Sequence, residues 1–174
     1  NGSNWTPIIN GLGSELIESM AISETHMYAG TNNGGIYLSI DKGNSWAALN
    51  TGIPKQPVNS LVTDGANIYV GVSGGEGIYL SNDHGNNWRP ANNGLTHKYV
   101  RALILNGTNL FSGTLYNGGI FISNNNGDNW APSNKGISDL GIISLTLNGS
   151  NFYAGINTGG FQSSNDYGAN WAPV

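Results

Sequence analysis

Several common ingredients of protein chemistry are scarce or absent in this chain of 174 residues. There is no cysteine, which excludes disulfides and thiol catalysis. Only six residues are basic and ten are acidic, so the chain lacks the basic stripe that nucleic-acid binding requires. No apolar run approaches the ~20 residues of a membrane helix. We therefore expect neither a nucleic-acid partner nor membrane insertion.

Turn-forming residues, in contrast, are abundant. The chain contains 27 glycines and 27 asparagines, and both are poor helix formers, which argues against an all-helical fold. Five tryptophans and a hydrophobic content of 38% argue against disorder, because disordered chains have few aromatic residues and many charges. The remaining class is all-β with many tight turns. The low charge and the Asn, Gly, Thr and Ser content favour a secreted, extracellular protein of bacterial type.

The tryptophans reveal an internal repeat. They occur at positions 5, 46, 88, 130 and 171, with spacings of 41, 42, 42 and 41 residues. Such a regular period indicates four copies of one supersecondary unit. We divide a single domain, residues 1–174, into repeats at about 5–45, 46–87, 88–129 and 130–170, and the start of a further strand follows at 171–174.

Each repeat contains four short runs with strand character. In the third copy these are Val100 to Leu105, Leu110 to Gly113, Ile120 to Ser123 and a run that starts at Trp130. Such runs are rich in Ile, Val, Tyr and Phe and are separated by turn residues. Four antiparallel strands in ~42 residues form the blade of a β-propeller. The alternative is a β-solenoid, but solenoid repeats are usually shorter and their strands are parallel.

Two local features give further expectations. Asn106-Gly107 and Asn148-Gly149 predict type I′ hairpin turns between the first and second runs, because both central residues of such a turn need positive φ. The first run is apolar at nearly every position, which predicts a strand that is buried on both faces.

A motif of the form Ser-x-Asp-x-Gly-x-x-Trp begins at the end of the third run in each of the four repeats. We call this motif the box. Its aspartate position is filled by Asp41, Asp83, Asn125 and Asp166, and its tryptophans are Trp46, Trp88, Trp130 and Trp171. We expect the carboxylate to accept backbone N–H bonds across its own turn and the glycine to supply positive φ. The tryptophan should pack between blades. These residues therefore have a structural role, and the asparagine in the third copy should be a weaker, uncharged acceptor.

The box resembles the Asp-box, or BNR repeat, of sialidases, xyloglucanase-like enzymes, sortilin-type receptors and secreted bacterial propellers. Four copies in register extend the resemblance over the whole chain. The resemblance implies a β-propeller of four-stranded antiparallel blades. It also implies that the boxes lie at the blade periphery, away from the face that carries ligands.

Strand alternation predicts two faces. The hairpin turns between the first and second runs share one face with the boxes, and the remaining loops share the other. Residues that break the repeat pattern near the second face are the candidate ligand-binding residues, and they are Glu76, His97, Lys98, Tyr99, Arg101 and Tyr116. Aromatic rings beside polar groups suit sugar stacking. The alternative interpretation is that these are ordinary solvated loop residues.

Enzyme hypotheses can be tested by counting residues. The resemblance to sialidases implies a cluster of three arginines, but this chain contains only Arg89 and Arg101. A glycosidase needs two facing carboxylates. Glu15, Glu76 and Asp139 belong to the ligand face, but they come from different repeats and form no recognisable motif. The three histidines, at positions 26, 84 and 97, are scattered, so no metal site is indicated. We predict no catalytic residues, no metal and no cofactor.

The chain ends raise the question of ring closure. The outer run starts five times while the other three runs occur four times, so Trp5 to Ile9 and Trp171 to Val174 compete for one position. Either the chain is part of a longer array, or it closes by association, for example as two chains in an eight-bladed ring. Three functions remain open. They are a non-catalytic binding module for a glycan or protein, a fragment or relative of a glycoside hydrolase, and a self-associating structural or designed repeat protein. The first is favoured.

Overall fold

The computed structural model of the protein describes residues 2–13, 15–23 and 25–174. Glu24, which falls in the hairpin turn expected for the first repeat, lies outside the described residues, as do Asn1 and Ser14. The described part is all-β and contains no helix that could span a membrane. Its strands form four antiparallel sheets of four strands each, in chain order, as the repeat predicts. We call these sheets blades 1 to 4.

The blades have closely similar boundaries. Blade 1 contains β1 (Ile17–Ile22), β2 (Met27–Thr31), β3 (Ile36–Ser39) and β4 (Ala47–Ala48). Blade 2 contains β5 (Val58–Thr63), β6 (Ile68–Val72), β7 (Gly77–Ser81) and β8 (Arg89–Pro90). Blade 3 contains β9 (Val100–Asn106), β10 (Asn109–Thr114), β11 (Gly119–Ser123) and β12 (Ala131–Pro132). Blade 4 contains β13 (Ile142–Asn148), β14 (Asn151–Ile156), β15 (Phe161–Ser164) and β16 (Ala172–Pro173).

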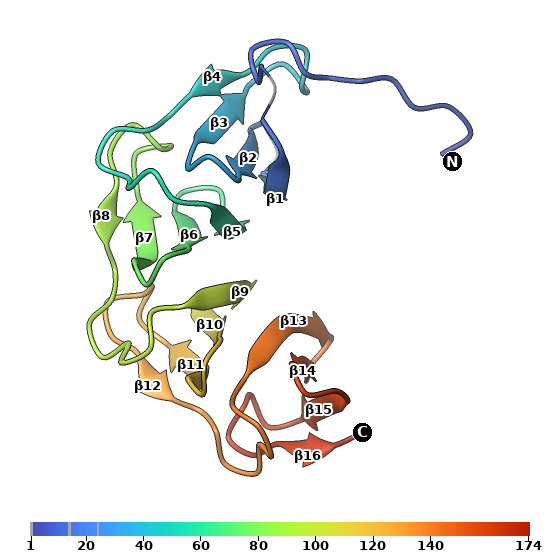
Figure 1. Cartoon of the computed structure of the whole chain (residues 1–174), viewed down its shortest axis with the longest axis vertical. Helices are drawn as coiled ribbons and strands as arrows, with labels where there is room; N and C mark the ends of the chain where they lie inside the picture. The colour runs from blue at the N-terminus through green and yellow to red at the C-terminus, as the bar shows by residue number, and fades with distance from the viewer. Residues whose placement is uncertain (1, 14, 24) are drawn as a thin grey trace.

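The blades follow one another along a C-shaped arc with their first strands innermost (Figure 1). β1 packs on β5, β5 on β9 and β9 on β13. Side chains of these four strands, including Met20, Leu61, Leu103 and Leu145, line a common central hollow. Among the described residues, no packing of that extent joins blade 4 to blade 1. A single chain is therefore an open arc.

The second strand of each blade is more buried than the first, which corrects the expectation that the first strand is buried on both faces. Every residue of β6 is buried, whereas β9 and β13 are largely half-buried or exposed. The second strand has hydrogen-bonded neighbours on both edges, and in blades 2 and 3 it also has a blade on each side. The first strand borders the central hollow, so its apolar side chains are covered only where an adjacent blade contacts them.

The hairpins between first and second strands also differ from the prediction. Asn106 pairs with Asn109, so the two central residues are Gly107 and Thr108 and not Asn106 and Gly107. Of these two, only Gly107 has positive φ, at 61°, which corresponds to a type II′ turn. Gly149 has the same φ in blade 4. The pairing of β9 with β10 continues one residue further than predicted, to Asn106 and Asn109. Gly107 is then the first of the two central turn residues, and only this position needs positive φ.

The type I′ geometry occurs instead in the boxes. In the first box Lys42 and Gly43 have φ of 59° and 88°, and the Asn44 N–H donates to the Asp41 carbonyl oxygen at 3.4 Å. The aspartate side chain also bonds across this turn. In the first box, Asp41 Oδ1 accepts from the backbone N–H of Ser45 at 2.9 Å and Oδ2 accepts from its hydroxyl at 2.6 Å. These bonds hold the turn that leads into the tryptophan.

The asparagine box keeps the turn with fewer bonds. Asn125 Oδ1 accepts from the Asn129 backbone N–H at 3.0 Å and from the Ser123 hydroxyl at 2.9 Å. The Asn129 side chain accepts a hydrogen bond from Asn93. The second acceptor oxygen of the carboxylate is missing, so the third box relies on its backbone bond.

The box tryptophans are buried. Trp88, Trp130 and Trp171 pack between consecutive blades, whereas Trp46, in the first blade of the arc, packs with Leu12 and Ala29. Trp46, Trp88, Trp130 and Trp171 are 4–7% exposed. The Trp88 indole N–H donates to the Leu49 carbonyl oxygen of the preceding blade at 3.0 Å. The glycines of the linkers lie against the backbone of the box tryptophans. A Cβ on Gly94, for example, would lie 2.2 Å from the Trp130 carbonyl oxygen. Each tryptophan thus fixes its blade to the linker before it.

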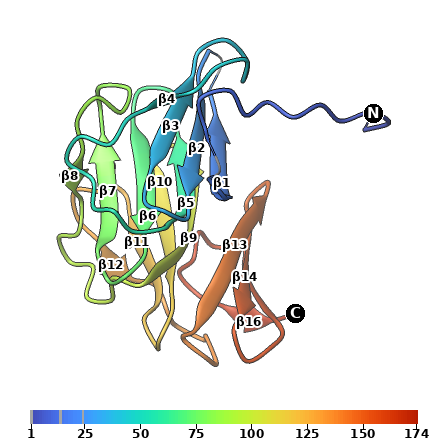
Figure 2. The ribbon, with the colours of Figure 1, turned by 45° about the horizontal axis from the view of Figure 1, so that its top comes forward.

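Of the two segments that could supply the fourth strand of blade 4, Trp5 to Ile9 and Trp171 to Val174, only the second forms a strand. β16 pairs with β15 through Ala172 and Pro173, whereas residues 2–9 form no strand and extend away from blade 1 in both views (Figure 1, Figure 2). Trp5 is 89% exposed. Only the end of this segment contacts blade 1, where the Ile8 carbonyl oxygen accepts from the Trp46 indole at 3.0 Å. The C-terminal strand therefore holds the position.

Candidate ligand-binding face

The two predicted faces are present. Each loop between second and third strands approaches the linker that leads into the next blade or into its own first strand. Thus Gly34 approaches Gln56, Gly75 approaches the Tyr99 ring, and Gly118 approaches His97. On the opposite face, the β1–β2 hairpin meets the second box, where the His26 and His84 rings stack at 5.2 Å. We call the first the loop face and the second the hairpin face.

An exposed aromatic pair stands on the loop face of blade 3. Tyr99 immediately precedes β9, and Tyr116 lies in the β10–β11 loop. Their ring centroids are 4.9 Å apart and the ring planes are nearly perpendicular, at 89°. The residues are 46% and 72% exposed, so the pair offers ring surface to solvent. Large exposed aromatic surfaces are typical of binding sites.

The backbone under Tyr116 is unusual for the residue that it carries. Tyr116 and Asn117 have φ of 54° and 65°, in the left-handed region. The equivalent loop of blade 2 uses Gly74 and Gly75 there, with φ of 77° and 82°. A left-handed conformation costs about 1–2 kcal/mol for a residue with a Cβ, and glycine avoids that cost. The fold alone therefore gives no reason for a tyrosine at this position.

The structure places the other candidate ligand-binding residues at varying distances from this pair. His97 lies beside it, against Phe121 with ring centroids 6.3 Å apart, and Lys98 is exposed on the same linker. Glu76 is half-buried in the blade 2 loop. Burial, together with the neighbouring Glu76 carboxylate, raises the pKa of the Tyr79 hydroxyl. Arg101 does not join the pair but lines the central hollow, together with Glu18, Asn59 and Ile143.

The carboxylates considered for glycoside hydrolysis have separate surroundings. Asp139 accepts from the Thr158 hydroxyl at 2.7 Å and from the Gly141 backbone N–H at 2.8 Å. These bonds lower the pKa of Asp139 and commit its carboxylate to loop structure. Glu15 and Glu76 lie in blades 1 and 2. The two arginines are also apart, because Arg89 contacts Asp128 of the third box at 3.5 Å while Arg101 lines the hollow.

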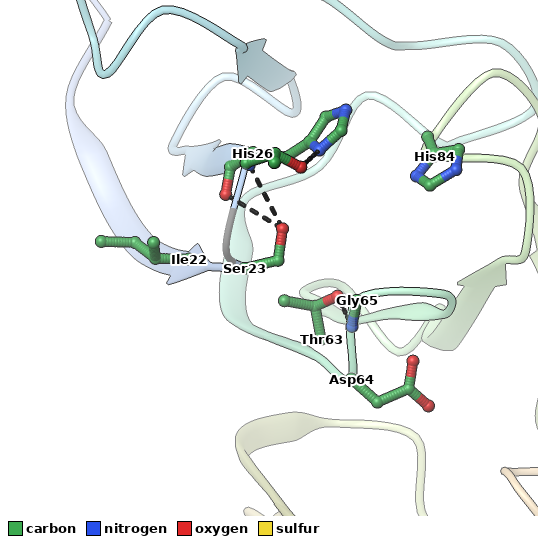
Figure 3. A pocket seen from close by; sticks show the side chains of 8 residues that line it. Ile22, Ser23, His26, Thr63, Asp64, Gly65 and His84 are labelled. Carbon is green, nitrogen blue, oxygen red and sulfur yellow. Dashed lines mark hydrogen bonds between the residues drawn. The ribbon is translucent and has the colours of Figure 1, made fainter.

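Sequence reasoning missed a second hollow, on the hairpin face (Figure 3). It has a volume of about 560 Å³ and is lined by Ile22, Ser23, Thr25, His26, Thr63, Asp64, Gly65 and His84. The two histidines are not scattered, because the first hairpin and the second box meet at the boundary between blades 1 and 2. The repeat alignment could have predicted this contact, because the hairpin turn that carries His26 and the box that carries His84 lie on the same face of adjacent repeats.

The side chains of this hollow are largely committed to local structure. His26 Nδ1 is hydrogen-bonded to the Thr25 hydroxyl at 2.6 Å. Asp64 Oδ1 accepts from the backbone N–H groups of Ala66 and Asn67, at 2.9 and 2.6 Å. Burial opposes ionisation of Asp64, but the bonds from Asn67 and Ala66 outweigh it and lower the pKa. The residues that the structure describes contain no group of three His, Cys, Asp or Glu that could hold a metal ion.

Comparison with known proteins supports the fold. No protein-family model and no curated protein matches the sequence. An ancestral GH74 enzyme is similar in structure with a TM-score of 0.73 and 21% identity, over 100% of this chain and 26% of that one. The computationally designed Ika4 protein gives 0.68 and 13%, over 87% and 91%. YCF48 bound to D1 peptide gives 0.66 and 17%, over 91% and 53%. At these identities the likeness shows the fold, a β-propeller of four-stranded blades, and the chain spans about a quarter of the GH74 enzyme.

Proposed function

We propose that this chain is a non-catalytic binding module of the Asp-box propeller type, which presents its loop face to a ligand. The observation that carries the proposal is the Tyr99–Tyr116 pair. Both rings are exposed, and Tyr116 occupies a left-handed position that blade 2 fills with glycine. The left-handed Tyr167 lies against the buried Phe152, whereas the aromatic neighbour of Tyr116 is itself exposed. Contact of the Tyr99–Tyr116 pair with another molecule explains this arrangement best.

A protein segment is the favoured ligand. The rings stand at the boundary between blades 2 and 3, with His97 and Lys98 beside them, so an extended chain can contact both ring faces and polar groups. Tyrosine is enriched at protein interfaces because it supplies a large contact area at low entropic cost. The likeness to a propeller bound to a peptide agrees with this choice. A glycan is the alternative ligand, because sugar rings stack on exposed aromatic faces.

Glycoside hydrolysis is the second candidate function, and the likeness to a GH74 enzyme is the observation that favours it. Hydrolysis requires two carboxylates placed on either side of one glycosidic bond. Asp139 is held by Thr158 and Gly141, and no partner carboxylate contacts it among the described residues. Binding without hydrolysis therefore accounts better for this surface.

The proposal includes a setting and an assembly. The low charge and the Asn- and Gly-rich composition favour a place outside the cell. Because a single chain is an open arc, we also propose that the ring is completed by association.

Two arrays test the proposal directly, one of peptides and one of glycans, both probed with the labelled 174-residue chain. The expected result is saturable binding to one array that is lost in Tyr116→Gly. The loss follows because the substitution removes the more exposed ring and leaves a residue that the backbone accepts. Release of sugar from xyloglucan or another polysaccharide, abolished by Asp139→Asn or Glu76→Gln, would overturn the non-catalytic assignment.

A further inference from the structure

The two ends of the arc expose positions that a neighbouring blade covers at the boundaries inside it. In blade 4, Phe161 is 63% exposed, whereas its counterparts Ile36, Ile78 and Ile120 are 0% exposed. In blade 1, Ile17 and Met20 are 40% and 49% exposed. Their counterparts in blades 2 and 3 are almost completely covered, with Val58 and Leu61 at 0% and 5% and Val100 and Leu103 at 1% and 6%. Each end therefore lacks a neighbour that every inner blade has.

The three internal boundaries show what these positions contact. The face of a blade that looks toward the next blade, its forward face, supplies an aromatic residue and an isoleucine. The rear face of the next blade supplies residues of its first strand and its box tryptophan. At the first boundary Tyr28 and Ile36 share a core with Val58, Leu61 and Trp88. The other two boundaries repeat this combination, with Tyr69, Ile78, Val100, Leu103 and Trp130 in one, and Phe111, Ile120, Ile142 and Trp171 in the other.

A glycine in the second strand makes this contact close. A Cβ on Gly30, Gly71 or Gly113 would lie 2.5–2.6 Å from the Val58, Val100 or Ile142 side chain of the next blade. Blade 4 keeps the glycine, as Gly155, but the nearest atoms to a Cβ there belong to Ser144 and Ile143 of the same blade. Gly155 has the register that, at the three internal boundaries, receives the first residue of a following first strand. Among the described residues, the first residue of a first strand that lacks such a cover is Ile17 of blade 1, which is 40% exposed.

We propose that two copies of this chain associate head to tail, with the forward face of blade 4 in each copy packed on the rear face of blade 1 in the other. The inference rests on the proposed completion of the ring, and it identifies the partner and the contact residues. Phe161 and Gly155 of one copy contact Ile17 and Met20 of the other, continuing the internal boundaries. Because each copy has one forward and one rear face uncovered, a two-fold pair covers all four and closes a ring of eight blades.

In this pair the N-terminal segment cannot occupy the outer strand position of a blade. Trp5 to Ile8 and Trp171 to Val174 are equivalent stretches of the repeat, and the pair brings them to the same outer position. Trp171 is 4% exposed and β16 is already paired with β15, whereas Trp5 is 89% exposed. The C-terminal stretch therefore stays in place and the N-terminal one lies outside. Removal of residues 1–7 should leave the association intact.

The test is the molar mass of the 174-residue chain by sedimentation equilibrium over roughly a hundredfold range of concentration. The expected mass is twice 18.3 kDa. Met20→Asp and Phe161→Asp should each reduce it to 18.3 kDa, because a carboxylate in either face prevents burial of that face. Ile40→Asp is the matched control, since Ile40 is 70% exposed in the first box and should leave the mass doubled. Circular dichroism confirms that each variant is folded.

Mixing the variants tests the polarity of the contact. Met20→Asp keeps an intact forward face and Phe161→Asp keeps an intact rear face, so an equimolar mixture should regain pairs through one boundary. A wild-type chain that stays monomeric, or a Met20→Asp variant that still pairs with itself, would overturn the proposal. So would loss of pairing on removal of residues 1–7, which would indicate exchange of the outer strand. Ligand binding by the folded Phe161→Asp monomer is measured separately, so failure of the association leaves the loop-face function testable.

Discussion

Trp88→Ala tests whether the boxes hold the blades together through their tryptophans. The Trp88 side chain is 6% exposed and packs at the first blade boundary with Tyr28, Ile36 and Leu61. Burial of a tryptophan removes roughly 150–250 Å² from water, an upper limit of about 4–6 kcal/mol. Truncation of a buried aromatic residue typically costs about 3–5 kcal/mol, because the cavity closes only in part. We expect a loss of that size in the free energy of unfolding.

The assay is urea unfolding followed by circular dichroism, with Trp5→Ala as the matched control. Trp5 has the same repeat position but is 89% exposed, so its truncation should change the free energy of unfolding by less than about 0.5 kcal/mol. Trp171→Ala is a second comparison. The buried indole N–H of Trp171 has no hydrogen-bond partner among the described residues, so this truncation removes packing but no indole hydrogen bond. A loss below about 1 kcal/mol for Trp88→Ala, or equal losses for Trp88→Ala and Trp5→Ala, would refute the reasoning.

Three further predictions concern the turns and the aromatic pair. Hydrogen bonds from Asn170 and Ser164 lower the pKa of Asp166 to about 2, below the ordinary 3.8, so its stabilisation is present above pH 3.8 and is lost as the pH falls through 2. The thermal midpoint of Asp166→Asn should therefore lie below that of the wild type at pH 7 and converge with it near pH 2, and a constant offset would contradict this. Gly94→Ala should cost more than Gly65→Ala in thermal melts, since both glycines have positive φ but only Gly94 abuts a neighbour, the Trp130 carbonyl. Equal costs would show that the close approach is unimportant. Tyr116→Gly should change the free energy of unfolding by less than about 1 kcal/mol, because relief of the left-handed strain offsets the lost ring contact. A larger loss in urea unfolding would make Tyr116 a structural residue.

Much of the fold follows from the repeat, because each box combines several local requirements in one short segment. The spacing of the five tryptophans predicts four blades, the four runs in each repeat predict the strands, and the box predicts the bonds to Asp41. Backbone details follow less well. Asn106-Gly107 satisfies two hairpin geometries, and the pairing of Asn106 with Asn109 selects between them. Apolar content also cannot distinguish a strand between two blades from one beside an opening.

The candidate site was predictable only in part. Tyr99 and Tyr116 stand out because they break the repeat, and the structure brings them together. Arg101 breaks the repeat equally well, but its position on the first strand sends it to the central hollow. The His26–His84 contact depends on which turns of adjacent blades meet. That relation belongs to the packing of blades and is absent from any single repeat.

The central claim is that the loop face binds a ligand through the Tyr99–Tyr116 pair. The most direct measurement is a binding titration of the peptide or glycan selected on the arrays, with Tyr116→Gly compared to Tyr167→Gly. Tyr167 is the matched control, with φ of 57° and 55% exposure, but it lies in the fourth box, on the hairpin face. The account predicts that Tyr116→Gly weakens binding at least roughly tenfold, about 1.4 kcal/mol, while Tyr167→Gly leaves it unchanged. Equal affinity in both variants, or a loss confined to Tyr167→Gly, would contradict it.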